Sequence, residues 1–510
     1  MTKINRLLIK FCQVVAVFIA FFGTFAVHAD ELRMQTPADF GQLDPAFWQS
    51  KSDQTVIDAI FPKLIEFKSG TNWEYELSAA ESIEQVDPLT IKFTLKKGLM
   101  WTGGYGEVTA EDVEYSFERY IDEDLAAPNS GDWAALKDVE VVDKYSGIIH
   151  FNEPFAPVWW STLPYTGGAI VNKASTEAAG GKFTTEPGAT AGPYKIEKWE
   201  QGKQTVLVAH DGWNVGKKPA YDRVILIPIS DAKSAEVAFE AGQIDVSKIA
   251  ISSVQELQAN MPADSVLEVR PTARYTWVGL NAENPALQDV RVRQAITKAI
   301  DVDAIIEGAY FGIPDRSTGL IAPGLIGFSK EAQPARDVDG AKALLADAGI
   351  DSLNVELELQ NSKDEQTAGL IIQANLAEIG INVQLNTHDG GTFWSLGDEK
   401  GTNLQMTLKE YASPPDPAWS TQWFLPGQAG IWNWEWFNSE EYEKLHYAAI
   451  SETDFDKRAK IYHEMQDIMD ASHSFVWLIH PPKSVIYKNS INPGLLPNGD
   501  YNLKAFSPAK

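Results

Sequence analysis

The sequence predicts a large α/β protein, and three observations favour this class. The chain has 510 residues, of which 44% are hydrophobic and 22% charged, a balance typical of a folded protein with a full core. Strand-like runs alternate with helical ones, so helices are expected to connect the strands. At roughly 150 residues per domain, the length predicts three to four domains or two large ones.

Local patterns predict the individual elements. Residues 91–95 alternate between apolar and polar, as in a half-buried strand, and residues 224–229 form the continuous apolar run of a covered strand. Thr109 is expected to begin a helix, because Asp112 follows three residues later as in a capping box. The aromatic-rich stretch 410–438 is too long for a simple connection and is expected to be functional. Further helices are predicted at 290–300, 339–348, 366–379 and 442–469.

The first 29 residues predict a cleaved secretory signal peptide. Three basic residues stand at the start: Lys3, Arg6 and Lys10. An apolar run over residues 11–27 follows, and residues 27–29 match a signal-peptidase site. A membrane anchor is disfavoured, because the run is shorter than the roughly 20 residues of a span and no charged stop-transfer cluster follows. The mature chain is expected to begin at Asp30 in the periplasm, without a lipid anchor, since Cys12 lies inside the apolar run.

Composition and motifs exclude several functions. A formal net charge of −27 repels phosphate backbones, so nucleic-acid binding is not expected. The zinc-protease pattern that starts at His463 fails, because position 467 is Asp where a second His is needed. The sequence contains neither a G-x-S-x-G elbow nor a phosphate-binding loop. We therefore predict no catalytic residue, metal ion or cofactor. A two-carboxylate hydrolase stays open as an alternative, because no spacing singles out a pair among 70 acidic residues.

Several stretches together resemble a known family. They are Leu43-Asp44-Pro45, 77–104, 108–120, 191–199, 239–246, 289–301, 339–350 and Ser413-Pro414-Pro415-Asp416-Pro417. In this order they are similar to the bacterial extracellular solute-binding protein family 5. The family comprises the binding proteins of ABC importers for oligopeptides, dipeptides, nickel complexes and some sugars. The resemblance spans nearly all of the mature chain, with one extra residue in the turn at 103–107 as a departure.

The resemblance implies a two-lobed periplasmic binding protein of the Venus-flytrap type, type II-like, with an extra subdomain in the N-terminal lobe. Lobe I would hold residues 30–279, with the inserted subdomain at about 70–185, and residues 487–510 would return to it. Lobe II would hold residues 280–486. The chain would cross near 279–281 and near 485–488. The lobes would close on a ligand and deliver it, as a monomer, to a membrane permease.

Five of the 16 tryptophans lie within 18 residues: Trp419, Trp423, Trp432, Trp434 and Trp436. The last three alternate, so on an extended backbone they would point the same way and form an apolar wall. Such a wall accepts aliphatic or sugar C–H groups and cations. The alternative is a local hydrophobic core.

The loop after residue 410 supplies three further candidates, Tyr411, Ser413 and Asp416. In peptide binders of the family, the first acidic residue of this loop pairs with the α-ammonium of the ligand, and Ser413 stands there. Asp416 matches the second acidic residue, which more often stabilises the turn. Ala418 replaces the His of the nickel binders, which disfavours a nickel complex.

Six residues elsewhere complete the candidate site. Arg274, Tyr275 and Trp277 precede the first expected crossing, where an Arg would clamp a carboxylate or form a surface ion pair. Asp44 and Trp48 follow the N-terminal loop, which resembles the cleft rim of the family, and Trp394 lies in the expected lobe II. The expected ligand is a sugar, an opine-like sugar–amino-acid conjugate or a short peptide. A receptor that presents its ligand to a chemosensory partner is the remaining alternative.

Overall fold

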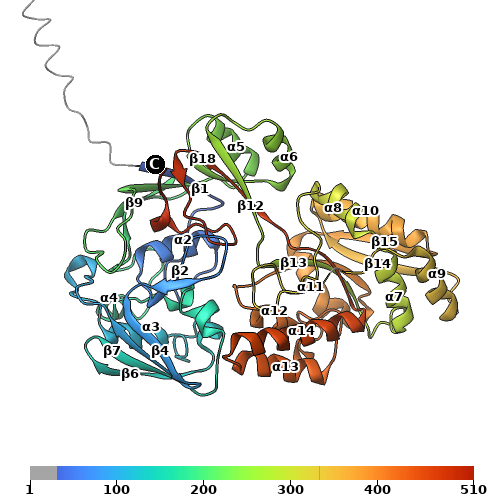
Figure 1. Ribbon diagram of the computed structural model, residues 1–510, viewed down its shortest axis with the longest axis horizontal. Helices are drawn as coiled ribbons and strands as arrows, with labels where there is room; N and C mark the ends of the chain where they lie inside the picture. The colour runs from blue at the N-terminus through green and yellow to red at the C-terminus, as the bar shows by residue number, and fades with distance from the viewer. Residues whose placement is uncertain (1–30, 332, 510) are drawn as a thin grey trace, which may run out of the picture.

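The structure is a computed structural model that describes residues 31–331 and 333–509 (Figure 1). The predicted signal peptide and Asp30 lie outside the described residues. Within the described residues, no helix is long and apolar enough to cross a membrane. The fold is α/β as predicted, and it contains two large sheets and one smaller antiparallel sheet.

The first large sheet has seven strands. The central strand β1 (Glu31–Thr36) pairs in parallel with β10 and β11, and the other pairs are antiparallel. Helices α2 (Lys51–Ile60), α5 (Ala232–Glu240) and α6 (Ile251–Ala259) accompany it. In sheet order the strands are β12 (Ser265–Arg270), β18 (Lys483–Lys488), β11 (Val246–Ile249), β1, β10 (Arg223–Pro228), β9 (Gln204–Ala209) and β8 (Tyr194–Glu200).

A four-stranded antiparallel sheet is inserted between β1 and β8. Helix α3 (Ala110–Glu118) packs on it and begins with the predicted capping box of Thr109 and Asp112. The insertion also contains the hairpin of β2 (Ile65–Phe67) and β3 (Tyr75–Leu77) and the short α4 (Lys173–Ala178). One hydrophobic core joins this sheet to the seven-stranded sheet. Its strands, in order, are β4 (Ala80–Asp87), β5 (Thr90–Leu95), β7 (Ser146–Phe151) and β6 (Leu136–Asp143).

The second large sheet has five strands and its own cores. The strands, in order, are β15 (Ile381–His388), β14 (Leu353–Gln360), β16 (Met406–Ala412), β13 (Arg274–Leu280) and β17 (Phe475–Ile479). The helices of this part are α7 (Val290–Ala299), α8 (Val302–Tyr310), α9 (Val338–Asp347), α10 (Lys363–Ala377), α11 (Gly390–Lys400), α12 (Ala418–Thr421), α13 (Glu440–Ser451) and α14 (Phe455–Ser472). The helical region predicted at 442–469 is thus two helices, because Asp454 caps a new helix.

The chain passes between the two large sheets twice, at 271–273 and at 480–482. We call residues 31–270 and 483–509 lobe I and residues 274–479 lobe II. The expected crossings at 279–281 and 485–488 differ from these positions, because all seven residues of β13 pair with β16, and β18 pairs with β11 and β12. The C-terminal segment therefore returns to lobe I from residue 483 and lies beside β1 (Figure 1).

The two crossing segments are joined to each other. The Thr272 hydroxyl donates to the carbonyl of Pro481 at 2.6 Å. Next to it, the buried ring of His480 donates from Nδ1 to the carbonyl of Arg274 at 3.0 Å, and its Nε2 accepts from the Ser317 hydroxyl at 3.0 Å. Burial lowers the pKa of His480 to about 4, so the ring is neutral at pH 7.

This depressed pKa predicts loss of stability in acid. The folded state binds a proton at His480 only near pH 4, whereas the unfolded state binds it near 6.5. The unfolded state thus holds more protons in between, and the free energy of unfolding falls as the pH is lowered from 7.5. His480→Asn, which keeps an N–H donor but cannot titrate, should remove about 2 kcal/mol of the loss between pH 7.5 and 4.5.

Urea unfolding at several pH values measures this difference. Equal slopes for wild type and His480→Asn would show that the buried ring does not set the acid limit.

Candidate functional site

Three hollows are lined by residues of both lobes. The first, of about 190 Å³, lies at the crossings, where Trp73 and Asn498 of lobe I face Ala273 and Leu325 of lobe II. The second, of about 380 Å³, lies between the rings of Trp159 and Trp160 and helix α14. The third, of about 220 Å³, brings Phe155 opposite Trp419 and His446.

Direct contacts separate these hollows. The Ala156 N–H donates to the carbonyl of Ile450 at 2.7 Å, and the rings of Trp160 and Phe455 lie 6.1 Å apart. The two lobes therefore already touch between the second and third hollows. A solute held in this region would contact both lobes.

A face of three tryptophans lies on lobe II. Trp394 is 37% exposed and Trp432 40% exposed, with their ring centroids 6.3 Å apart. The half-buried Trp423 lies 5.4 Å from Trp432. We call Trp394, Trp423 and Trp432 the tryptophan face. Exposed indoles of this kind present apolar area at little cost in side-chain entropy.

A buried lysine, Lys409, lies among the aromatic side chains next to the tryptophan face. Lys409 is fully buried, and its ammonium lies 3.1 Å from the Glu435 carboxylate. It also lies 5.0, 5.5 and 4.6 Å from the rings of Trp277, Tyr411 and Trp434. Burial lowers the pKa of Lys409 to about 8, although Glu435 acts to raise it. The Tyr411 hydroxyl donates to the carbonyl of Trp432 at 2.7 Å, which holds the exposed tryptophan in place.

The predicted wall of Trp432, Trp434 and Trp436 is wrong in its geometry. The backbone turns at this point: the N–H groups of Trp432 and Asn433 donate to the carbonyl of Gln428, and Trp436 has φ +50°. The chain is not extended, so the side chains do not share a face. Trp432 is exposed, Trp434 is 1% exposed and packs against Phe393, and Trp436 is half-buried.

Two predicted aspartates are held in buried ion pairs. Asp44 accepts from the guanidinium of Arg119 at 3.0 and 2.6 Å, and Asp416 accepts from that of Arg458 at 2.6 and 2.8 Å. Both carboxylates are 0% exposed. Each fixes a loop, so neither reaches the surface of a hollow.

Of the remaining predicted residues near β13, some lie in the core of lobe II and others lie at its surface. Tyr275 and Trp277 are buried in the core of lobe II, and the Trp277 indole donates to Glu435 at 2.9 Å. Arg274 has 52% of its side chain exposed and pairs with Glu410 at 2.6 Å. Ser413 is half-buried next to the crossing, and its N–H donates to the carbonyl of Ala273 at 3.0 Å.

Two more predicted tryptophans lie in different lobes. Trp419 lines the third hollow. Trp48 is half-buried and lies edge-on to Tyr165, with ring centroids 6.2 Å apart. Its indole N–H has no hydrogen-bond partner among the described residues, which leaves a donor free.

A charged cluster in lobe I was not predicted. The Lys51 ammonium lies 3.3 Å from Asp500, and Lys483 pairs with the same carboxylate. Burial acts to raise the pKa of Asp500, but the charges of Lys51, Lys483 and Lys248 outweigh it and lower that pKa below its usual range. The three lysines are far apart in the chain, and only Lys483 and Asp500 lie near each other in sequence, so no local motif marks the cluster.

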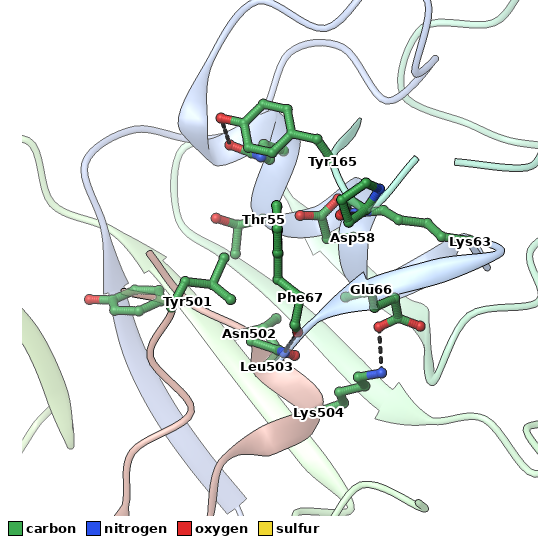
Figure 2. A pocket seen from close by; sticks show the side chains of 14 residues that line it. Thr55, Asp58, Lys63, Glu66, Phe67, Tyr165, Tyr501, Asn502, Leu503 and Lys504 are labelled. Carbon is green, nitrogen blue, oxygen red and sulfur yellow. Dashed lines mark hydrogen bonds and ion pairs between the residues drawn. The ribbon is translucent and has the colours of Figure 1, made fainter. Parts of the chain in front are cut away.

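A small polar pocket of about 30 Å³ lies in lobe I (Figure 2). Its charges are internally paired, Lys63 with Asp58 at 2.6 Å and Lys504 with Glu66. A cavity of this size has room for about one or two water molecules and not for an organic solute. Over the described residues, no group of three or more His, Cys, Asp or Glu could hold a metal ion.

Comparisons with known proteins agree with this architecture. The family model described as "Bacterial extracellular solute-binding proteins, family 5 Middle" matches residues 74–431. The probable D,D-dipeptide-binding periplasmic protein DdpA of Escherichia coli K12 is 27% identical over 477 residues, which cover 89% of each chain. The heme-binding protein A of Haemophilus influenzae is 26% identical over 460 residues, covering 82% of this chain and 81% of the relative.

Solved structures share the fold. HbpA2 from Haemophilus parasuis superposes with a TM-score of 0.84 at 24% identity, covering 94% of this chain and all of that one. MoaA from A. tumefaciens R10, solved in complex with mannopinic acid, has a TM-score of 0.73 at 24% identity with the same coverage. The two-lobed fold is thus confirmed. The match over residues 74–431 shows that the chain belongs to the bacterial extracellular solute-binding proteins of family 5, which bind solutes and are not enzymes.

Proposed function

We propose that this protein is the periplasmic binding component of an ABC importer, and that its lobes close on a small organic solute. The observation that carries the proposal is the pair of crossings at 271–273 and 480–482, beside hollows lined by both lobes. A ligand that contacts both lobes favours the closed state by its differential affinity for that state. The closed monomer would then dock on a membrane permease.

The ligand is proposed to be a sugar acid, a sugar–amino-acid conjugate or a peptide that is not held by its free amino end. A desolvated ammonium needs a charged partner. Ser413 offers only a hydroxyl, and the nearest predicted acids, Asp44 and Asp416, are each taken by a buried arginine. Glu410 pairs with Arg274. The tryptophan face supplies an apolar surface for a C–H-rich solute instead.

The relatives and structural neighbours bind solutes of several of these kinds. Among them are a probable D,D-dipeptide-binding protein, a glutathione-binding protein and a structure in complex with mannopinic acid. We use D-alanyl-D-alanine, glutathione and mannopinic acid as probes for this reason. An exported hydrolase is set aside because the family binds solutes, and no feature specifically favours a chemosensory role.

Closure predicts a change in shape and in stability. A bound probe should lower the radius of gyration in solution scattering, because the hollows between the lobes narrow. At a concentration of 100 times its Kd it should raise the free energy of unfolding by about 2.7 kcal/mol. Scattering that stays unchanged at saturation would exclude the hinge mechanism.

Because Trp432 is exposed and Trp434 is buried, we expect their substitutions to change different quantities, the ligand affinity for Trp432 and the stability for Trp434. Trp432→Ala should weaken binding of the probe about tenfold or more and change the free energy of unfolding by less than about 1 kcal/mol, because this side chain is exposed. Trp434→Ala should cost about 3–5 kcal/mol of stability, because it empties a buried site. Calorimetry and urea unfolding measure both. Tyr447→Ala, at an aromatic 52% exposed on α13, is the control and should leave both quantities unchanged.

Because Ser413 carries no charge, we expect that blocking the amino end of a peptide ligand has little effect on its affinity. N-acetylation of a bound peptide should change its affinity less than about threefold, because Ser413 offers a hydroxyl and no carboxylate to pair with the ammonium. Ser413→Asp should raise the affinity for the free peptide over the acetylated one by about tenfold. Loss of wild-type binding on acetylation would place an unrecognised acid at the amino end.

A further inference from the structure

The cluster in lobe I has more positive than negative charge. Lys51 begins α2, Lys248 lies in β11, Lys483 begins β18, and Asp500 lies in the C-terminal segment. Asp500 is the one carboxylate that interacts appreciably with Lys248 in the described structure. Three ammonium groups therefore share one carboxylate, in a protein whose formal net charge is −27.

Several donors of this cluster are unused. The Lys51 ammonium donates to Gln54 at 2.7 Å and to the Tyr165 hydroxyl at 2.6 Å, in addition to its pairing with Asp500. Lys483, in contrast, donates only to Asp500 among the described residues. Lys248 donates to no described acceptor and lies 5.3 Å from the ring centroid of Tyr501.

Tyr501 adds an independent sign of a missing partner. The residue is 5% exposed, and its buried hydroxyl has no hydrogen-bond partner among the described residues. Tyr501 lines the small pocket, and Figure 2 shows its hydroxyl pointing away from Thr55 and Asp58 of the same lining. A buried hydroxyl without a partner is costly, which favours a ligand or water beside it.

The cluster borders the region between the lobes. Lys483 directly follows the crossing at 480–482. The Asn498 amide donates to Asp500 at 2.9 Å, and Asn498 itself lines the first hollow. The site also lies at the carboxyl ends of the parallel strands β1 and β11, the edge at which α/β sheets bind ligands. A solute in the hollow therefore has a short path to the lysines.

A bound anion would stabilise the charged form of the Lys248 ammonium. Burial lowers the pKa of Lys248 to about 8, and Lys483 and Lys51 lower it further while Asp500 opposes them. These are the charged groups that face it from β18, α2 and the C-terminal segment. An added anion would favour the charged ammonium and raise this pKa.

We propose that Lys248 and Lys483, with Lys51 beside them, bind an oxyanion of the transported solute, a carboxylate or a phosphate. This inference rests on the proposed function and narrows its ligand to an anionic solute. The tryptophan face would hold the C–H-rich part in lobe II, and the lysines would hold the charge in lobe I. One ligand would thereby join the two lobes.

Paired probes test the charge requirement. D-alanyl-D-alanine, glutathione and mannopinic acid are each compared by calorimetry with their carboxamides, and a sugar phosphate is compared with the free sugar. The acid or phosphate should bind at least about tenfold more tightly than its neutral partner. Lys248→Met and Lys483→Met should remove this advantage and leave the affinity for the neutral partner unchanged. Lys218→Met, at an exposed lysine of lobe I, is the matched control. Equal affinities for acid and amide in the wild type would overturn the proposal.

A second measurement does not depend on the choice of solute. Dimethyl-lysine NMR of the full mature chain should show the Lys248 resonance titrating near pH 8 and shifting to higher pH with citrate or inorganic phosphate. The anion that acts at the lower concentration distinguishes carboxylate from phosphate. Lys248→Gln assigns the signal and serves if the Met variant does not fold. If no probe solute binds but the shift occurs, the ligand proposed above is wrong and the anion site stands. No shift with either anion would overturn the site.

Discussion

The double crossing between the lobes is the constraint on which the rest of the structure depends. Two short segments, 271–273 and 480–482, join the sheets, and the Thr272–Pro481 hydrogen bond ties these segments together. Pro271, Pro481 and Pro482 lack backbone donors, so they cannot extend either sheet across the gap. In the proposed closure, the lobes would bend about this pair. Closure would then change the surroundings of the residues near it, from Ser413 and Arg274 in lobe II to Lys483 in lobe I.

Two buried ion pairs fix one loop in each lobe. Arg119 binds Asp44 and so connects the loop after β1 to the inserted sheet, while Arg458 binds Asp416 and connects the 413–417 loop to α14. Removing one partner of such a pair leaves an uncompensated charge in the interior, which costs about 3–5 kcal/mol. The aspartates therefore act by position. In the proposed function, polar recognition would fall to groups that are not internally satisfied, such as the Trp48 indole N–H and the lysines around Asp500.

The two lobes offer different chemistry. Lobe II presents aromatic area, with Trp394 and Trp432 exposed above the buried Lys409–Glu435 pair. Lobe I presents a lysine cluster, in which Lys51, Lys248 and Lys483 surround the single carboxylate of Asp500. A solute with an apolar face and an anionic end would satisfy both surfaces only when the lobes approach each other. In the proposed binding mode, the local excess of lysines around Asp500 would outweigh the distant acids at short range, although the net charge of the protein is strongly negative.

The sequence by itself determined the fold class, the family and several element boundaries, including the Thr109 capping box, because periodicity and caps are local properties. It also pointed to the region of Trp423 and Trp432. Only the tertiary structure decided which side chains are exposed: the turn at Gln428 separates Trp432 from Trp434, and Arg119 and Arg458 withdraw two predicted acids from the surface. The lysine cluster had no signal in the sequence, because its three lysines come from distant segments. Their proximity arises from the pairing of β18 with β11 and from the return of the C-terminal segment to lobe I.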